Sequence, residues 1–581
     1  MKGYKEKVEV VMPGHSNLKS RVLFLLAGGL FLLAVLLPLT AMAGDDVQTL
    51  RLQLEQMTDQ MKGIQEKLEK MEAESAEEKA EIKEMDERLN KTELHTATDK
   101  ISFGVEFRTR ADTIHYQNIR VTPAAFSSAL MNPWPTGLNG ATLAQAQALM
   151  AGMNAAGMNL PSETVNADND LILTNKFRLN MKAKVSEELS FAGRLSAYKV
   201  FGDSTGLKYN GGSLGDVTFD GNTASLPHGD IIHLERAYFN YKFKTGTLPT
   251  NLSLGRRPAT DGPPLEYSNY SLEGGSPLAT IINWQFDGAS LNFGLEDATS
   301  IPGAAFKLCY GMGFESDWGN AASLNSPQPD VNDVNMFGVI ATMFDNDETS
   351  AVFNYAHASD ITDGFTGLTV MPFIVSKDSS TGTYSFAPNN GLYVSRVEPS
   401  TNIGDWDAAS LLLRTNLAER FSDIDLFLAT SWSHTDPSQI SKNPWFELQG
   451  QGLLSSNGDL QSRDGYSIYG GAVFPMPFNA RLGVEYNWGS EYWFNFTGAE
   501  DSLVGSKLAT RGQVVEGYWI QPVVADKFFV TLGGRYYDYE YSGSGNPMGA
   551  PVKIDELRYM DTINSVIDTV WNAYLSATLR F

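Results

Sequence analysis

Residues 176–185 read Lys-Phe-Arg-Leu-Asn-Met-Lys-Ala-Lys-Val, with a polar side chain at every even position and an apolar one at every odd position. Successive side chains of a β-strand point to opposite faces, so this segment predicts a strand with one apolar and one basic face. About ten such residues are what a tilted strand needs to cross the apolar core of a membrane. The stretch therefore predicts one strand of a membrane barrel, with lipid outside and water inside.

The same alternation recurs along the chain, at 101–107, 306–314 and 480–488. The connections between such segments alternate in length. Short turns are expected at 186–188, 244–246, 345–347, 475–477 and 525–526, and long polar loops at 112–170, 203–230, 360–403 and 541–567. Short connections at one end and long ones at the other are typical of bacterial outer-membrane barrels. Residues 99–581 are therefore predicted to form an all-β, antiparallel transmembrane barrel of about 16 strands, and a weak segment near 284–295 leaves fourteen or eighteen open.

The N-terminal part carries a targeting signal and a helix. Lys19 and Arg21 precede an apolar run at 22–39, and Ala-Met-Ala at 41–43 provides a small-residue cleavage site, so residues 1–43 are predicted to be a signal peptide; an uncleaved membrane anchor is the alternative. Residues 44–98 are predicted to form an α-helical coiled coil in the periplasm, because apolar residues recur at steps of three and four. The seam includes Leu50, Leu54, Met57, Met61, Ile64 and Leu68. A lone charged helix is the alternative, and the number of helices is left open.

Composition excludes several classes of function. The net charge of −24 argues against a nucleic acid partner, which needs a basic face. Cys309 is the only cysteine, which excludes disulfide frameworks, cysteine-based zinc sites and covalently bound c-type haem. The seven histidines lack metal-ligand spacing, and no motif of a hydrolase nucleophile, a phosphate-binding loop or a zinc protease is present. We therefore expect no enzyme activity, no metal and no cofactor.

Aromatic residues cluster near the ends of the predicted strands, where a girdle at the membrane–water boundary is expected. They are Trp318, Trp432, Trp488, Tyr492, Trp493, Tyr518, Trp519, Tyr536, Tyr537 and Trp571. Ordinary packing inside the protein is the alternative for each of them.

The last strand ends on the last residue of the chain. Its alternate apolar positions form one face and are Leu575, Ala577, Leu579 and Phe581. A terminal Phe after an alternating strand resembles the signal by which outer-membrane barrels reach their assembly machinery. This resemblance implies the barrel-assembly machinery as a partner.

Three phrases resemble known barrels. Leu-Glu-Arg-Ala-Tyr-Phe-Asn-Tyr at 234–241 resembles a strand of outer-membrane porins, and Phe-Asp-Gly-Ala at 286–289 resembles the porin strand that follows the pore loop. Residues 252–264 resemble a strand-to-loop phrase of a porin-like outer-membrane family of unassigned function. The resemblance to the porin superfamily implies a porin of the cell outer membrane for diffusion of small hydrophilic solutes. It also implies a homotrimer, since some porins with a periplasmic coiled coil assemble in this way.

Strand parity predicts a basic lumen. The expected pore-lining basic residues are Arg108, Lys176, Arg178, Lys182, Lys184, Arg194, Arg236, Arg257, Arg414, Arg481 and Arg535. Rings of such residues lower the barrier for anions, which gives the hypothesis of an anion preference. Alternatively, acids of an infolded loop pair with these side chains and leave little selectivity. A short helix expected at 141–157 and the loop after Pro258 are the two candidates for narrowing the pore, and the helix has the alternative of capping it from outside.

Other functions compete with the porin. A barrel scaffold sheathing a separate multihaem cytochrome, as part of an electron conduit across the outer membrane, fits the size, and haem absorbance in the purified protein would distinguish it. An outer-membrane lipase or protease needs a Ser–His or Asp–His pair at one rim, and the sequence does not reveal one. A tether toward the cell wall is compatible with a pore.

Overall fold

The computed structural model describes residues 101–581 except for gaps at 122–137, 159–160, 203–231, 272–273, 317–330, 364–366, 371–372, 389–393, 398, 450–453, 455–458, 499, 546–549, 559–560 and 562–564. Before residue 101 it describes six residues, all helical and exposed: Glu55, Asp59, Lys62, Gly63, Lys67 and Lys70. The expected signal peptide and the seam residues Leu50 to Leu68 lie outside the described residues. The chain divides into two compact units, Met1–Lys100 and Ile101–Phe581.

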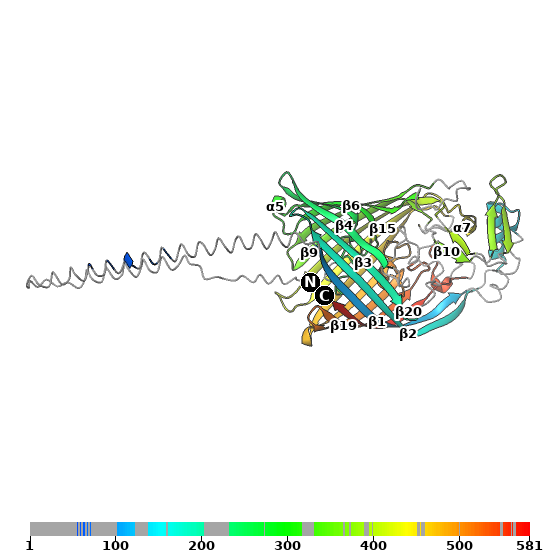
Figure 1. The fold of residues 1–581 in the computed structure, drawn as a ribbon. Coiled ribbons are helices and arrows are strands. Elements are labelled where there is room, and N and C mark those ends of the chain that lie inside the picture. Colours follow the sequence, from blue (N-terminus) through cyan, green and yellow to red (C-terminus); the bar gives the residue numbers. More distant parts are fainter. Residues whose placement is uncertain are drawn as a thin grey trace, which may run out of the picture. The chain divides into compact units, whose positions relative to one another are not determined.

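The second unit is a closed barrel of sixteen antiparallel strands, which confirms the predicted fold (Figure 1). Each strand pairs with its neighbours in chain order, and the last pairs with the first. The strands are β1 (Ile101–Val121), β2 (Glu163–Lys184), β3 (Leu189–Val200), β4 (Ile232–Thr245), β5 (Leu248–Arg256), β6 (Asp287–Gly294), β7 (Ala305–Phe314), β8 (Val334–Asp345), β9 (Thr349–Thr362), β14 (Asn402–Asn416), β15 (Asp425–Pro437), β16 (Arg463–Met476), β17 (Ala480–Gly489), β18 (Gly512–Val524), β19 (Phe528–Tyr539) and β20 (Thr569–Arg580).

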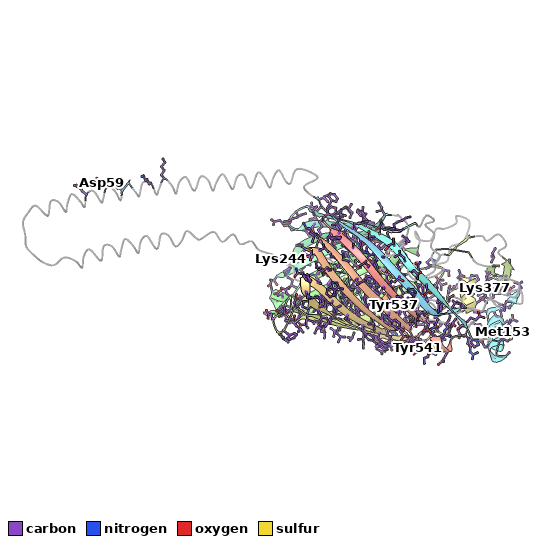
Figure 2. The ribbon with its side chains drawn as sticks, turned by 90° about the horizontal axis from the view of Figure 1, so that it is seen from below. Asp59, Met153, Lys244, Lys377, Tyr537 and Tyr541 are labelled. Atoms are coloured by element: carbon purple, nitrogen blue, oxygen red, sulfur yellow. The ribbon has the colours of Figure 1, made fainter. Side chains whose placement is uncertain are left out.

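The two ends of the barrel differ as the spacing of turns predicts. One end, called the turn end below, has the connections 185–188, 246–247, 295–304, 346–348, 417–424, 477–479 and 525–527. The other end, called the loop end, has the longer connections. Lys244 lies at the turn end, and Met153 and Lys377 lie at the loop end (Figure 2). The turn end also holds the short helix α5 (Glu296–Thr299) and the 3-10 helix η2 (Pro477–Asn479).

Side chains alternate between the two faces of the wall. On β1, Phe103 and Phe107 are exposed on the outside, whereas Arg110 and Asp112 are buried inside. The wall is a single sheet, with lipid on its outer face and the lumen on its inner face. Apolar and polar side chains therefore alternate along every strand. No helix among the described residues is long and apolar enough to span a membrane.

The predicted aromatic girdle needs correction. Trp432, Trp488, Trp519, Tyr536 and Trp571 fall on outward positions, but Trp493, Tyr518 and Tyr537 are buried inside the barrel. Tyr518 precedes Trp519 and Tyr537 follows Tyr536, and adjacent residues of a strand point to opposite faces, so only one of each pair can face lipid. Trp493 belongs to a loop that turns into the lumen. Tyr492 lies in the same loop, and Trp318 lies outside the described residues.

The helix expected at 141–157 is α4 (Leu143–Ala155). Thr142 and Gln145 form its capping box, in which the Thr142 backbone N donates to Gln145 Oε1 at 2.9 Å. The helix packs at the loop end with α7 (Pro444–Gln449) and with the hairpin of β11 (Phe373–Lys377) and β12 (Tyr384–Pro388), around the buried side chains Leu138, Ala146, Tyr384, Phe386 and Leu448. A second small pair, β10 (Gly367–Val370) and β13 (Val394–Val397), lies in the same connection as this hairpin. Of the two alternatives for the helix, the structure has the one outside the lumen.

Candidate functional site in the lumen

Two loops from the loop end fold into the barrel. The first inner loop is residues 257–286, between β5 and β6, and the second inner loop is residues 490–511, between β17 and β18. They meet through backbone hydrogen bonds, with Asn283 N donating to Phe496 O at 2.7 Å and Phe496 N donating to Ile281 O at 3.0 Å. One of the two constriction candidates, the loop after Pro258, is therefore in the lumen. The second inner loop was not expected there.

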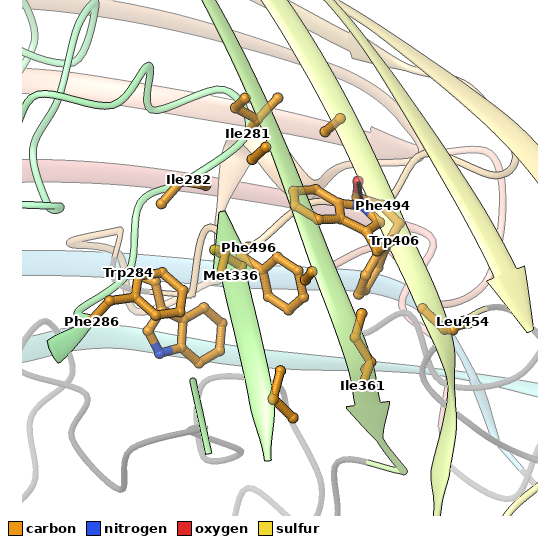
Figure 3. Packing of buried hydrophobic residues seen from close by; sticks show 14 of the residues in the cluster. Ile281, Ile282, Trp284, Phe286, Met336, Ile361, Trp406, Leu454, Phe494 and Phe496 are labelled. Carbon is orange, nitrogen blue, oxygen red and sulfur yellow. Dashed lines mark hydrogen bonds between the residues drawn. The ribbon is translucent and has the colours of Figure 1, made fainter. Parts of the chain in front are cut away.

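The loops create an apolar core inside the barrel (Figure 3). Trp406 of β14 is fully buried and meets the ring of Phe496 edge-on, with ring centroids 4.7 Å apart. The core also contains Ile281, Ile282, Trp284, Phe286, Met336, Ile361, Leu454 and Phe494. At this level the barrel encloses packed side chains, and any passage lies beside them.

The first inner loop is packed closely against itself. A Cβ added at Gly262 would lie 2.0 Å from the carbonyl oxygen of Pro277, and one at Gly274 would lie 2.2 Å from that of Asp261. Only glycine permits these approaches of backbone to backbone. The tight turns hold Asp261 in place, and its backbone N donates to Asn283 Oδ1 at 3.0 Å.

Ion pairs fasten this loop to the wall. Arg178 of β2 donates to Glu235 of β4 at 3.0 Å and to Asp261 of the loop at 2.9 Å. Arg194 of β3 also reaches Glu235, at 3.1 Å. On the opposite side Arg414 of β14 pairs with Glu266 of the loop at 2.6 Å. The wall supplies these three cations and the carboxylate of Glu235, and the loop supplies the carboxylates of Asp261 and Glu266.

The second inner loop is anchored at its base by a buried cation. Lys507, in the 3-10 helix η3 (Lys507–Ala509), donates to Glu485 of β17 at 2.5 Å and to Glu516 of β18 at 2.6 Å, and all three side chains are 1% exposed. Burial alone would lower the pKa of Lys507, but the two carboxylates raise it above its ordinary value. Arg535 of β19 joins the group through Glu516 at 2.7 Å.

The tip of this loop crosses the lumen to β1–β3. Asp501 accepts from Arg108 of β1, Lys176 of β2 and Tyr198 of β3. Burial would raise the pKa of Asp501, but Arg108 and Lys176 hold it well below its usual range, so the carboxylate is ionised. Next to the group is a gap of about 10 Å³, lined by Arg108, Arg110, Asp112, Thr174, Tyr198, Asp501, Ser502 and Leu503.

Ten of the eleven expected pore-lining basic residues occupy inward strand positions; the other, Arg257, begins the first inner loop. Seven are paired with an acid: Arg108, Lys176, Arg178, Arg194, Arg414, Arg481 and Arg535. Arg236 donates to the carbonyl of Thr260 at 3.0 Å, and the Arg257 guanidinium lies 5.5 Å from the centre of the Tyr238 ring. Lys182 and Lys184 lie near the turn end of β2 and are less buried than Lys176 and Arg178. The structure therefore contains ion pairs between basic side chains of the wall and acids of the infolded loops, which is the alternative to a lumen of unpaired basic residues.

The acids of the second inner loop, Glu500 and Asp501, were not expected in the lumen. One signal was available: residues 492–496 read Tyr-Trp-Phe-Asn-Phe, and such an aromatic run is unusual in a loop that is to remain in water. At the C-terminus, Leu575, Leu579 and Phe581 are exposed on the outward face and Ala577 is half-buried among them. This is the arrangement expected of that strand; its role in assembly stays a prediction.

A closed sixteen-stranded barrel with an apolar outside and a charged inside defines a porin-like outer-membrane β-barrel. Residues 166–581 match the family described as "Protein of unknown function (DUF3373)", and the chain belongs to this family. No curated protein matches the chain.

Three of the solved structures that match the chain are the following. OprB of Pseudomonas putida at high pH is 9% identical, with 83% of this chain and 94% of that chain covered and a TM-score of 0.37. OmpF of Salmonella typhi in complex with daunomycin is 9% identical, with 82% and 97% covered and a TM-score of 0.37. A mutant of the Rh. blastica porin is 11% identical, with 83% and 100% covered and a TM-score of 0.33.

Proposed function

We propose that this protein is an outer-membrane channel for small hydrophilic solutes and that it prefers anions. The observation that carries the proposal is the origin of the charges in the lumen. Ten of the expected basic side chains stand on the barrel strands. Of the acids that pair with them, Asp261, Glu266 and Asp501 come from the inner loops, and Glu235, Asp425 and Glu516 belong to the wall. A wall that is basic once its loops withdraw lowers the energy of an anion in a narrow, low-dielectric passage.

The filling of the lumen favours a narrow, selective passage over a wide water-filled pore. It also favours a channel over the sheath for a cytochrome, since the chain's own aromatic side chains occupy the interior. Charged and hydroxyl groups line the wall beside the core, which suits hydrophilic solutes. The proposal assigns the chain no catalytic activity and no nucleic acid partner.

The proposal is tested by the reversal potential of the purified protein in a planar bilayer under a KCl gradient. We expect a potential displaced toward that of chloride. Replacing Lys182→Glu and Lys184→Glu together should shift it toward that of potassium, because both inward positions lie near the turn end of β2 and exchange positive for negative charge. Lys527→Glu is the matched control, in an exposed turn at the same end. Cation selectivity of the unaltered protein would contradict the anion preference.

The assembly that we propose is a trimer held by the barrel walls and the periplasmic coiled coil of residues 44–98. The outward face of β20 would present the signal read by the barrel-assembly machinery. The heptad spacing supports the coiled coil but not the number of its helices, and the trimer rests on the resemblance to porins. The exposure of Leu575, Leu579 and Phe581 supports the assembly signal.

A further inference from the structure

We propose that Arg108, Lys176 and Tyr198 form a binding site for a carboxylate solute, and that Asp501 occupies this site as a built-in latch until a solute displaces it. The inference rests on the proposed channel function and names the class of solute. It concerns the tip of the second inner loop and the wall that it touches.

The geometry is that of a complete carboxylate site. Arg108 Nη1 donates to Asp501 Oδ2 at 2.5 Å and Nη2 donates to Oδ1 at 3.1 Å. Lys176 Nζ donates to Oδ2 at 2.8 Å, and the Tyr198 hydroxyl donates to Oδ1 at 2.5 Å. The planar fork of an arginine matches both oxygens of a carboxylate, and the two further donors complete their coordination.

The three donors belong to the wall. Arg108 is the register partner of Lys176, and Lys176 is the register partner of Tyr198, so they form one row across β1, β2 and β3. The ladders between these strands fix the spacing of the row whether or not Asp501 is present. Lys176 and Tyr198 are buried, at 3% and 4% exposure, so the row is shielded from bulk water.

The bound carboxylate belongs to a loop tip that is attached through side chains. Among the described residues of 498–505, the backbone-to-backbone hydrogen bonds stay within the loop, such as Ser502 N to Glu500 O at 2.8 Å. Leu503 and Val504 add apolar packing against a cluster that includes Ile114. Glu500, beside Asp501, pairs with Arg535 of β19 at 3.4 Å, and the base of the loop is anchored by Lys507. The displacement that we propose is therefore confined to Asp501 and the residues that directly follow it.

Exchange is favourable only for a solute with the right charge. Withdrawal of Asp501 alone would leave Arg108 and Lys176 uncompensated in a poorly hydrated place, which is unfavourable. A carboxylate that enters as Asp501 leaves preserves the charge and the hydrogen bonds. The gap beside the site has room for about one water and reaches Arg110 and Thr174, on the side of the loop end, where such a solute would approach.

The test uses the full-length protein in a planar bilayer at constant KCl, with succinate, inorganic phosphate or glucose added on either side. We expect succinate to raise the mean conductance of the unaltered channel about tenfold, within the range usual for coupling between a ligand and a conformational change. Asp501→Asn should raise the conductance without solute to a similar degree and abolish the response to succinate. Asp459→Asn is the matched control, the same substitution in an exposed loop, and should respond like the unaltered protein.

A direct measurement of binding tests the latch independently of the proposed channel function. By calorimetry, D501N should bind succinate more tightly than the unaltered protein, and D501N combined with Lys176→Met should lose this binding, with folding checked by heat-modifiable migration on gels. Conduction without these differences would overturn the latch and leave the channel standing. Binding as expected in a protein that does not conduct would overturn the channel and keep the carboxylate site. Equal or tighter binding of phosphate would overturn the assignment to carboxylates.

Discussion

Lys507 is a buried cation shared by two carboxylates of the barrel wall. It is enclosed by Glu485 and Glu516, and the hydroxyl groups of Tyr518 and Tyr574 donate to these same carboxylates at 2.9 and 2.8 Å. Removal of the ammonium would leave two buried carboxylates with one fewer cation. Breaking a buried pair from one side is costly because the remaining charge has no water to compensate it.

Lys507→Met should therefore lower the free energy of unfolding by about 3–5 kcal/mol. The raised pKa fixes the pH range of this effect: the contribution of Lys507 is fully present below the unfolded pKa of about 10.4 and is lost only as the pH rises through the higher folded value. The difference from the unaltered protein should thus be constant between about pH 6 and 9. Urea unfolding in detergent measures it, with Lys527→Met in an exposed turn as control. Equal midpoints for both variants would contradict the prediction.

Strands β17–β20 carry a repeated pairing of glycine and tyrosine. Gly483 is the register partner of Tyr518, and Gly533 is the register partner of Tyr574. A Cβ at Gly483 would lie 2.0 Å from the Tyr518 ring, and one at Gly533 would lie 2.4 Å from the Tyr574 ring. Each ring thus lies flat over a neighbouring glycine, and its hydroxyl is directed along the wall to a carboxylate that binds Lys507 or Arg535.

Gly483→Ala should displace the Tyr518 ring and weaken its hydrogen bond to Glu485. We expect a loss of about 1–3 kcal/mol, as for overpacking of a filled interior. Gly517→Ala is the matched control, because a Cβ there meets nothing within 4 Å. Equal unfolding midpoints for the two variants would show that the Tyr518 ring does not need a glycine at position 483.

The strands were predictable because each is a local pattern. Apolar and polar residues alternate within ten residues, and the short turns between strands carry residues suited to them. The barrel and a count of about sixteen strands therefore followed from the sequence, with fourteen or eighteen left open. Parity within a strand also placed most of the basic side chains on the inward face. It failed where two aromatic residues are adjacent, as at Tyr536 and Tyr537, because residue type alone does not say which of the two faces lipid.

The course of the loops was not predictable in this way, because it depends on partners far away in the sequence. Asp501 finds Arg108 across 393 positions of the chain, and Asp261 finds Arg178 across 83. An acidic residue in a long polar loop looks the same whether the loop stays in water or folds inward. The packing of the two inner loops in the lumen could therefore not be predicted from the sequence.

At the scale of the whole molecule, the coiled coil of residues 44–98 remains a prediction. Its apolar seam gains stability only when a partner helix covers it. A chain lacking residues 44–98 but retaining its signal peptide should still fold a heat-modifiable barrel, since Ile101–Phe581 forms its own compact unit. It should be smaller in oligomeric state than the full chain when measured by light scattering in detergent. An unchanged oligomer would show that the barrel walls alone hold the subunits together.

The ring closes between the two ends of its own sequence. Val105 N donates to Phe581 O at 2.7 Å, and Phe581 N donates to Val105 O at 3.0 Å. β1 is the first strand of the barrel in chain order, and its partner β20 is the sixteenth. Until β20 pairs, one edge of β1 has no native neighbour, and each unpaired backbone group in hydrocarbon costs several kcal/mol. Closure of the wall therefore depends on the pairing of these two strands, which runs from Glu106 with Arg580 to Gln117 with Thr569. A barrel in which they separate has an open seam.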